Sequence, residues 1–125
     1  MLKIKGLSKA ETQAVQEVKN RLVRKYKDRL LLLMLYGSKA RGDSHKYSDI
    51  DLLAVVRRDT LKIRDELFDE TYEVMSKYDF KFLICLAVMG KNEFEIYKKG
   101  NFSFYRNITR EGIDLWPKTK KKKLT

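Results

Sequence analysis

Asp49 and Asp51 are the residues of this chain whose type and spacing most clearly indicate chemistry. They lie two positions apart in a segment that reads as a strand, so both side chains leave the same face of it. Two carboxylates at this distance repel one another unless a cation lies between them. The chain has one histidine and one cysteine, which excludes a His-rich or Cys-based metal site. The expected cation is therefore Mg²⁺, which prefers oxygen ligands.

A turn before the two aspartates has the properties of a phosphate site. An apolar segment ends at Gly37 and is followed by one expected helical turn, Ser38 to Arg41. The glycine allows the backbone to approach a phosphate, and the N–H groups of the turn can receive it. Ser38 adds a hydroxyl donor, and Lys39 or Arg41 can neutralise phosphate oxygens, Arg41 with the better bidentate geometry. Alternatively, both basic side chains belong to a solvated turn and contact no phosphate. A nucleoside triphosphate at this place would supply the remaining Mg²⁺ ligands.

The elements that must position these residues alternate between helix and strand. Ser8 and Glu11 have capping-box spacing, and the apolar residues after them recur at helical steps, which predicts a helix over 8–28. Further along the chain, the pattern predicts strands over 30–36, 48–56 and 80–88, a helix over 61–78, a helical turn over 92–97, a short helix over 103–111 and an edge strand over 113–116. This order predicts an α/β or α+β fold with a small sheet.

Length and charge indicate one basic domain. A chain of 125 residues supports a single core, which is expected over 1–117, and the lysine-rich segment 118–125 is expected to be a flexible tail. The net charge of +11 permits contact with nucleic acid, but a run of lysines attracts it only unspecifically. The longest uncharged apolar run, 30–36, is far shorter than a membrane span, and the N-terminus has no apolar signal core. A cytoplasmic protein without a membrane segment is expected.

The order of these residues resembles a known signature. Gly37-Ser38, ten intervening residues and then Asp-x-Asp, with Ala40-Arg41-Gly42 and Ser48-Asp49-Ile50-Asp51-Leu52 in register, resembles the DNA polymerase beta-like nucleotidyltransferase superfamily. More narrowly, the chain is similar to the minimal nucleotidyltransferases. Many of these are antitoxins that pair with a helical partner of the HEPN class (higher eukaryotes and prokaryotes nucleotide-binding). The resemblance covers the core from the first helix to the third strand, and 104–113 is similar to the terminal segment of one branch.

The resemblance implies a fold and a site. The fold would be the polymerase beta-like palm, a small mixed sheet with helices packed on one side and the Gly-Ser turn beside the Asp-x-Asp strand. Gly37 and Ser38, with Arg41, would hold the triphosphate, and Asp49 and Asp51 would bind Mg²⁺. Two-metal catalysis would follow, in which one ion stabilises the leaving pyrophosphate and the other activates an attacking hydroxyl.

The resemblance also implies a third carboxylate, because such proteins usually carry one between apolar residues on a neighbouring strand. Asp79 lies between Tyr78 and Phe80, at the entry to the strand expected over 80–88. It is therefore the candidate for the third catalytic and metal-binding acid. Its alternative role is to cap the junction between helix and strand. Cys85, later in the same expected strand, is expected to be a small core residue.

The expected function is Mg²⁺-dependent transfer of a nucleoside monophosphate, AMP from ATP, to a hydroxyl of a partner protein. Relatives that modify antibiotics or tRNA ends carry a further helical domain for the acceptor, and too few residues follow the third strand to form one. The acceptor surface would come from a HEPN-type partner, as in a toxin–antitoxin pair, or from a second copy in a homodimer. The alternatives are a catalytically weak antitoxin that acts by contact, a stand-alone enzyme with a small-molecule acceptor, and an RNA-binding protein.

Overall fold

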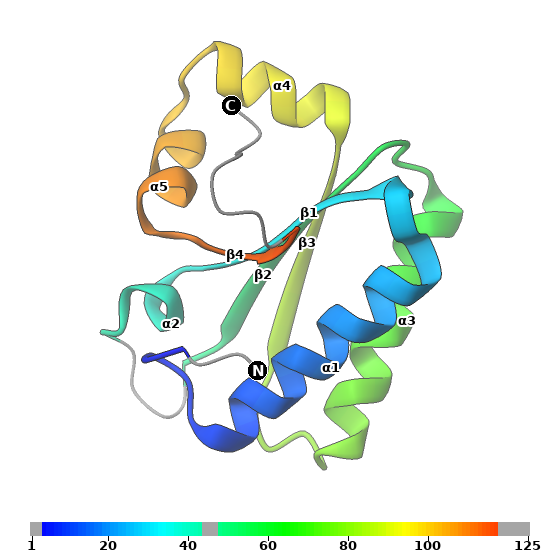
Figure 1. The fold of residues 1–125 in the computed structure, drawn as a ribbon, viewed down its shortest axis with the longest axis vertical. Helices are drawn as coiled ribbons and strands as arrows, with labels where there is room; N and C mark the ends of the chain where they lie inside the picture. The colour runs from blue at the N-terminus through cyan, green and yellow to red at the C-terminus, as the bar shows by residue number, and fades with distance from the viewer. Residues whose placement is uncertain (1–3, 44–47, 118–125) are drawn as a thin grey trace.

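The computed structural model describes residues 4–43 and 48–117, so the tail expected over 118–125 lies outside the described residues. The described chain forms a mixed four-stranded sheet with helices on both faces (Figure 1). Its strands are β1 (Leu30–Tyr36), β2 (Ile50–Val56), β3 (Ile84–Gly90) and β4 (Ile113–Trp116). Its helices are α1 (Lys9–Tyr26), α2 (Ser38–Arg41), α3 (Leu61–Lys77), α4 (Lys91–Lys99) and α5 (Ser103–Glu111), with the 3₁₀ turn η1 (Lys27–Arg29) after α1.

The strand order is β3-β2-β1-β4, which confirms the predicted mixed sheet. β1 is antiparallel to both β2 and β4, while β2 and β3 are parallel and α3 connects them. The register pairs Asp51 of β2 with Tyr36 of β1 on one side and with Cys85 of β3 on the other. Asp51 therefore lies where three strands meet at one end of the sheet.

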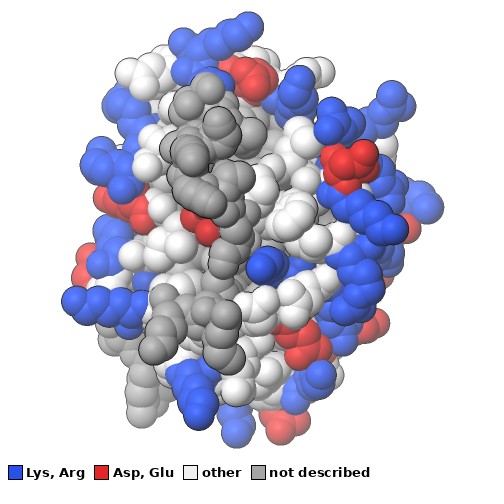
Figure 2. Space-filling view, in the orientation of Figure 1, with Lys and Arg blue, Asp and Glu red and all other residues white. Residues whose placement is uncertain are grey.

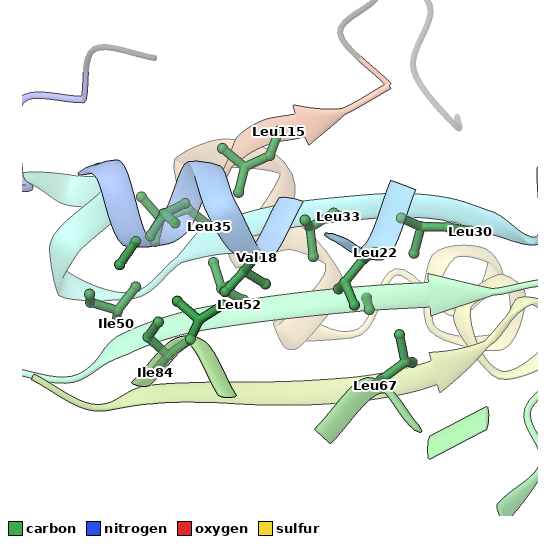
Figure 3. Close-up of a cluster of buried hydrophobic side chains, with 14 of the residues drawn as sticks. Val18, Leu22, Leu30, Leu33, Leu35, Ile50, Leu52, Leu67, Ile84 and Leu115 are labelled. Atoms are coloured by element: carbon green, nitrogen blue, oxygen red, sulfur yellow. The ribbon is translucent and has the colours of Figure 1, made fainter. Parts of the chain in front are cut away.

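One face of the sheet is covered by α1 and α3, which pack side by side (Figure 1). α1 begins with the predicted capping box, in which the side chains of Ser8 and Glu11 accept hydrogen bonds from each other's backbone N–H groups. Figure 3 shows the core beneath these helices, with the labelled side chains Val18, Leu22, Leu33, Leu35, Leu52 and Leu67 among its members. Burial of each such leucine stabilises the fold by about 2 kcal/mol.

The opposite face is partly covered by α4 and α5, which corrects the expectation that helices pack on one side of the sheet only (Figure 1). β1 and β2 carry apolar side chains toward both faces, so neither face can be left to solvent. The buried members of this second cluster are Leu32, Met34, Leu53, Val55, Met89, Phe94 and Ile108. The segment expected to be a single helical turn, 92–97, is thus part of a nine-residue helix that packs through Phe94.

The third strand begins four residues later than predicted. Asp79 and Phe80 have φ angles of 57° and 54°, a left-handed conformation that strands do not adopt. The Phe80 N–H donates to the carbonyl of Met75, so the chain turns back on the end of α3 before it enters β3. Local backbone geometry, not apolar content, therefore decides where β3 starts.

Basic side chains lie around much of the outline of the face shown in Figure 2, with acidic side chains among them. Across the two packed helices, Arg21 of α1 contacts Glu70 and Glu73 of α3 at 3.0 and 2.8 Å. Pairs at the surface contribute between zero and about 1 kcal/mol each. Among residues 4–43 and 48–117, no helix is long and apolar enough to cross a membrane.

An ion pair at the start of α3 should make stability depend on acid pH. The Arg64 guanidinium donates to both oxygens of Asp59 at 2.8 Å and also to the Val88 carbonyl of β3. These hydrogen bonds hold the pKa of Asp59 below its ordinary 3.8. A lowered carboxyl pKa stabilises the fold above pH 3.8, and this contribution is lost as the pH falls through the folded pKa.

Asp59→Asn is therefore expected to lower the free energy of unfolding at pH 7 by about 0.5–1 kcal/mol, the range for a partly exposed pair. The difference from the wild type should shrink at pH 3, because the carboxyl of the unfolded wild-type chain is protonated below its ordinary pKa of 3.8. Urea unfolding at the two pH values checks this. An equal difference at both would show that the ion pair is not the cause.

Candidate active site

Gly37 brings the two halves of the motif together. It follows β1 with a φ of +80°, and a Cβ at this position would lie 2.5 Å from Asp51 Oδ2. A side chain is thus excluded on two grounds, backbone conformation and space. After it, the predicted helical turn α2 (Ser38–Arg41) is present, and Gly42 ends the turn in a left-handed conformation with a φ of 83°. The Gly-Ser turn therefore lies directly against a carboxylate of Asp-x-Asp.

The two aspartates differ in their surroundings. Asp51 is within β2 and half-buried, whereas Asp49 immediately precedes the strand and is exposed. Burial raises the pKa of Asp51, and the negative charge of Asp49 raises it further. Both causes disfavour the ionised carboxylate, and a bound cation would offset both. The pair therefore has the electrostatics of a cation site.

Cys85 of β3 lies beside this pair, so the prediction that it is a core residue is wrong. It is exposed, and its Sγ is 3.5 Å from Asp49 Oδ2. β3 is an edge strand and runs parallel to β2, so the register places Cys85 next to Asp51. Partial burial of the sulfur raises the pKa of the thiol, and the negative charge of Asp49 raises it further. The thiol is thus a poor nucleophile at neutral pH.

Asp79 is not brought to the two aspartates. It is exposed in the turn between α3 and β3, where its N–H donates to the Ser76 carbonyl. In the part of the chain that the structure describes, no group of three His, Cys, Asp or Glu side chains is arranged to hold a metal ion. The structure therefore gives no support to Asp79 as a third acid, and it places the residue at the helix–strand junction that the alternative role requires.

The two cations of α2 point to opposite sides of the turn. Arg41 is exposed, and its guanidinium contacts Asp43 at 3.1 Å and Glu111 of α5 at 3.4 Å. Lys39 is buried, with its Nζ 3.0 Å from Glu11 Oε2 of α1. Arg41 thus lies at the surface, whereas the prediction that Lys39 belongs to a solvated turn is wrong, and its buried ion pair with Glu11 gives no support to a phosphate contact.

Tyr36 is a residue of this site that sequence reasoning missed. It is half-buried opposite Asp51, and its ring packs edge-on against Phe104 of α5 with centroids 6.1 Å apart. Phe104 in turn contacts Tyr97 of α4 at 5.8 Å. Burial raises the pKa of Tyr36, with a further contribution from the Asp51 charge. Aromatic side chains of β1, α4 and α5 therefore lie beside the aspartates, on the side of α5.

The comparisons with known proteins identify the family of the chain. The sequence matches the nucleotidyltransferase domain family over residues 15–123. Two proteins of Methanocaldococcus jannaschii, both provisionally named protein adenylyltransferases, are similar over nearly their whole length. One is 35% identical over 106 residues, which cover 85% of this chain and 98% of the relative. The other is 30% identical over 105 residues, which cover 82% of this chain and 96% of the relative.

Similar solved structures are more distant in sequence. A chain from a mutant form of the toxin–antitoxin MntA–HpeT is 20% identical with a TM-score of 0.48, over 81% of this chain and 71% of that one. A provisionally named nucleotidyltransferase of Sulfolobus solfataricus is 19% identical with a TM-score of 0.48, over 96% of this chain and 98% of that one. These two likenesses are too weak to bear on activity or partners. Because the family match and both M. jannaschii relatives extend over most of its length, the chain belongs to the nucleotidyltransferase domain family and is a nucleotidyltransferase.

Proposed function

We propose that this nucleotidyltransferase binds ATP with Mg²⁺ and transfers AMP to a hydroxyl of a partner protein. The observation that carries the proposal is the contact between the Gly37 turn and Asp51, where a Cβ would be only 2.5 Å from the carboxylate. This contact places the proposed anion-binding turn next to the pair of carboxylates at one end of the sheet. A cation held by the carboxylates would therefore lie next to phosphates held by the turn.

Asp49 and Asp51 fit Mg²⁺ by the chemistry of their donors. Both offer carboxylate oxygens, and burial together with the negative charge of Asp49 raises the pKa of Asp51, so a bound cation would stabilise its ionised form. When bound, the metal would neutralise phosphate charge and favour departure of pyrophosphate. The contribution of the chain is to hold the two carboxylates on one face beside the turn. Ser38 would donate its hydroxyl and backbone N–H to phosphate oxygens, and Arg41 would leave Asp43 and Glu111 to contact them.

The acceptor that we propose is a hydroxyl on a second protein. The two M. jannaschii relatives are named for transfer of an adenylyl group to protein, and this chain covers 98% and 96% of them. A chain of this size thus corresponds to the whole of each relative. A helical partner of the HEPN class in a toxin–antitoxin pair remains the proposed acceptor, as the motif resemblance implies.

One observation favours a second candidate, an antitoxin that acts by contact with little catalysis. Among the described residues, no third carboxylate joins Asp49 and Asp51. A second metal ion would then be held less firmly, and nucleotide binding would persist with weak transfer.

ATP labelled at different phosphates distinguishes these candidates. The chain is incubated with Mg²⁺ and soluble protein of its own cells, with ATP labelled at either the α or the γ phosphate. AMP transfer predicts protein-bound label from the α position only, and its loss in Asp49→Asn. Label from the γ position that requires the added chain and is lost in Asp49→Asn would contradict the proposal, and absence of label with intact ATP binding would favour the contact antitoxin.

Asp79→Asn is expected to leave both ATP binding and label transfer unchanged. The residue is exposed in the turn after α3 and does not join the two aspartates. Initial rates of transfer for Asp79→Asn, Asp49→Asn and the wild type check this. Loss of transfer with retained binding in Asp79→Asn would restore it as the third acid.

A further inference from the structure

Glu11 and Lys39 form a buried ion pair that the proposed chemistry does not use. Their side chains are only 8% and 3% exposed, and Lys39 Nζ is 3.0 Å from Glu11 Oε2. The other oxygen of Glu11 accepts the Ser8 N–H at 2.9 Å, as part of the capping box of α1. One carboxylate thus connects three parts of the chain: the segment before α1, the first turn of α1, and α2.

Stability alone is a poor explanation for this pair. Removing two charges from water costs nearly as much free energy as their attraction returns, so apolar residues of similar volume are often equally stable at such a place. A buried pair does, however, have a strict geometry, because both partners must keep their hydrogen bonds. It therefore fixes the relative position of the elements that it joins.

Of the elements that the pair joins, α2 depends most on tertiary contacts for its position. It consists of four residues, Ser38–Arg41, and a helix of one turn has no stable position of its own. Lys39 directly follows Ser38, and its carbonyl packs so closely against Gly6 that a Cβ on Gly6 would collide with it. The start of the chain thus holds Lys39 by both its backbone and its side chain, while Glu111 contacts Arg41 at 3.4 Å on the α5 side.

We propose that Glu11 and Lys39 are positioning residues for the nucleotide: their buried ion pair fixes α2 so that Gly37 and Ser38 present their phosphate-binding groups beside Asp51. Lys39 does not touch the nucleotide in this account. The inference rests on the proposed function, in which the Gly37–Ser38 turn receives the phosphates. The inference predicts that substitutions in α1 alter the affinity for ATP, although α1 is remote in sequence from the motif.

The double variant Glu11→Gln/Lys39→Met separates positioning from stability. It removes both charges, keeps an oxygen to accept the Ser8 N–H and replaces lysine by an apolar side chain of similar length. We expect it to fold with a Tm close to that of the wild type. Its dissociation constant for Mg²⁺–ATP should rise at least about tenfold, because a displacement of about 1 Å is costly at a preorganised site. Calorimetry and thermal unfolding on the same samples give both quantities.

Tyr26→Phe is the matched control at the other end of α1. It removes the hydrogen bond from the Tyr26 hydroxyl to Glu66, which is 2.7 Å long and far from α2. It should lower the Tm by about 5 °C and leave ATP affinity unchanged. If the affinity for ATP falls in both variants in proportion to the fall in Tm, the positioning role is contradicted.

The remaining outcomes separate this inference from the proposed function. Wild-type protein that does not bind Mg²⁺–ATP would overturn the proposed function, and this inference with it. Wild-type binding that Asp49→Asn abolishes, together with undiminished affinity in the double variant, would overturn only the inference. If the double variant does not fold, Gly6→Ala decides: we expect it to weaken ATP binding by displacing Lys39, and wild-type affinity in this variant would contradict the role of the pair.

Discussion

Replacing Asp51 with Asn should reduce nucleotide transfer by about 10²–10³-fold, the range for removal of one preorganised electrostatic contact. Asparagine has nearly the shape of aspartate but lacks the charge that a cation requires. Asp51 also lies against Gly37 and between Tyr36 and Cys85, so the substitution removes the charge at the point where the Gly-Ser turn meets the Asp-x-Asp strand. Initial rates of label transfer from α-labelled ATP measure the effect.

The same substitution should leave stability unchanged or increase it. Burial and the charge of Asp49 raise the pKa of Asp51 above its ordinary 3.8. A raised carboxyl pKa means that the folded state holds its proton more strongly than the unfolded state, so stability falls as the pH rises from 3.8 through the folded pKa. Asp51→Asn removes this loss. A fall in both activity and Tm would indicate a structural defect, and Asp65→Asn, at an exposed position of α3, is the control for the substitution itself.

Gly37→Ala should also have a large effect, on binding and on stability together. The residue has a φ of 80° and a ψ of −162°, a region that is essentially restricted to glycine. The added Cβ would in addition lie 2.5 Å from Asp51 Oδ2. We expect the free energy of unfolding to fall by about 2–3 kcal/mol and affinity for Mg²⁺–ATP to fall at least about tenfold as the turn moves away from Asp51.

Gly42→Ala is the control for a positive φ without a contact to Asp51. Gly42 has a nearly equal φ of +83°, but a Cβ there would meet nothing within 4 Å. It should cost about 1 kcal/mol, the ordinary penalty of a left-handed alanine, and leave ATP affinity nearly unchanged. Equal loss of affinity in the two variants would show that the contact between Gly37 and Asp51 is not important. Calorimetry and urea unfolding provide the comparison.

The parts of the site that the sequence predicts are those carried by local pattern. Gly37, Ser38, Asp49 and Asp51 lie on adjacent strands or their connection, and the resemblance of the motif to the nucleotidyltransferase signature implies that the turn lies beside the Asp-x-Asp strand. The capping box of α1 and the short helix over 103–111 were predictable for the same reason, because their signals lie within a few residues. Most of the sheet follows from apolar runs that end at turns.

The parts that could not be predicted depend on tertiary contacts or on unusual backbone angles. Asp79 has apolar neighbours like a strand residue, but its φ of 57° turns the chain before β3 begins. Lys39 reads as a solvated turn because its partner Glu11 is 28 positions away, and the capping box already accounts for a glutamate there. Cys85 reads as a core residue because the register that brings it beside Asp51 is a property of the sheet.

Calorimetric titration of the full chain with ATP, with and without Mg²⁺, beside Asp49→Asn shows whether the Asp-x-Asp carboxylates and the Gly-Ser turn form one Mg²⁺–nucleotide site. A single site predicts binding that requires Mg²⁺ and is lost in the variant while the Tm is retained. Binding that is independent of Mg²⁺, or that persists in Asp49→Asn, would contradict it.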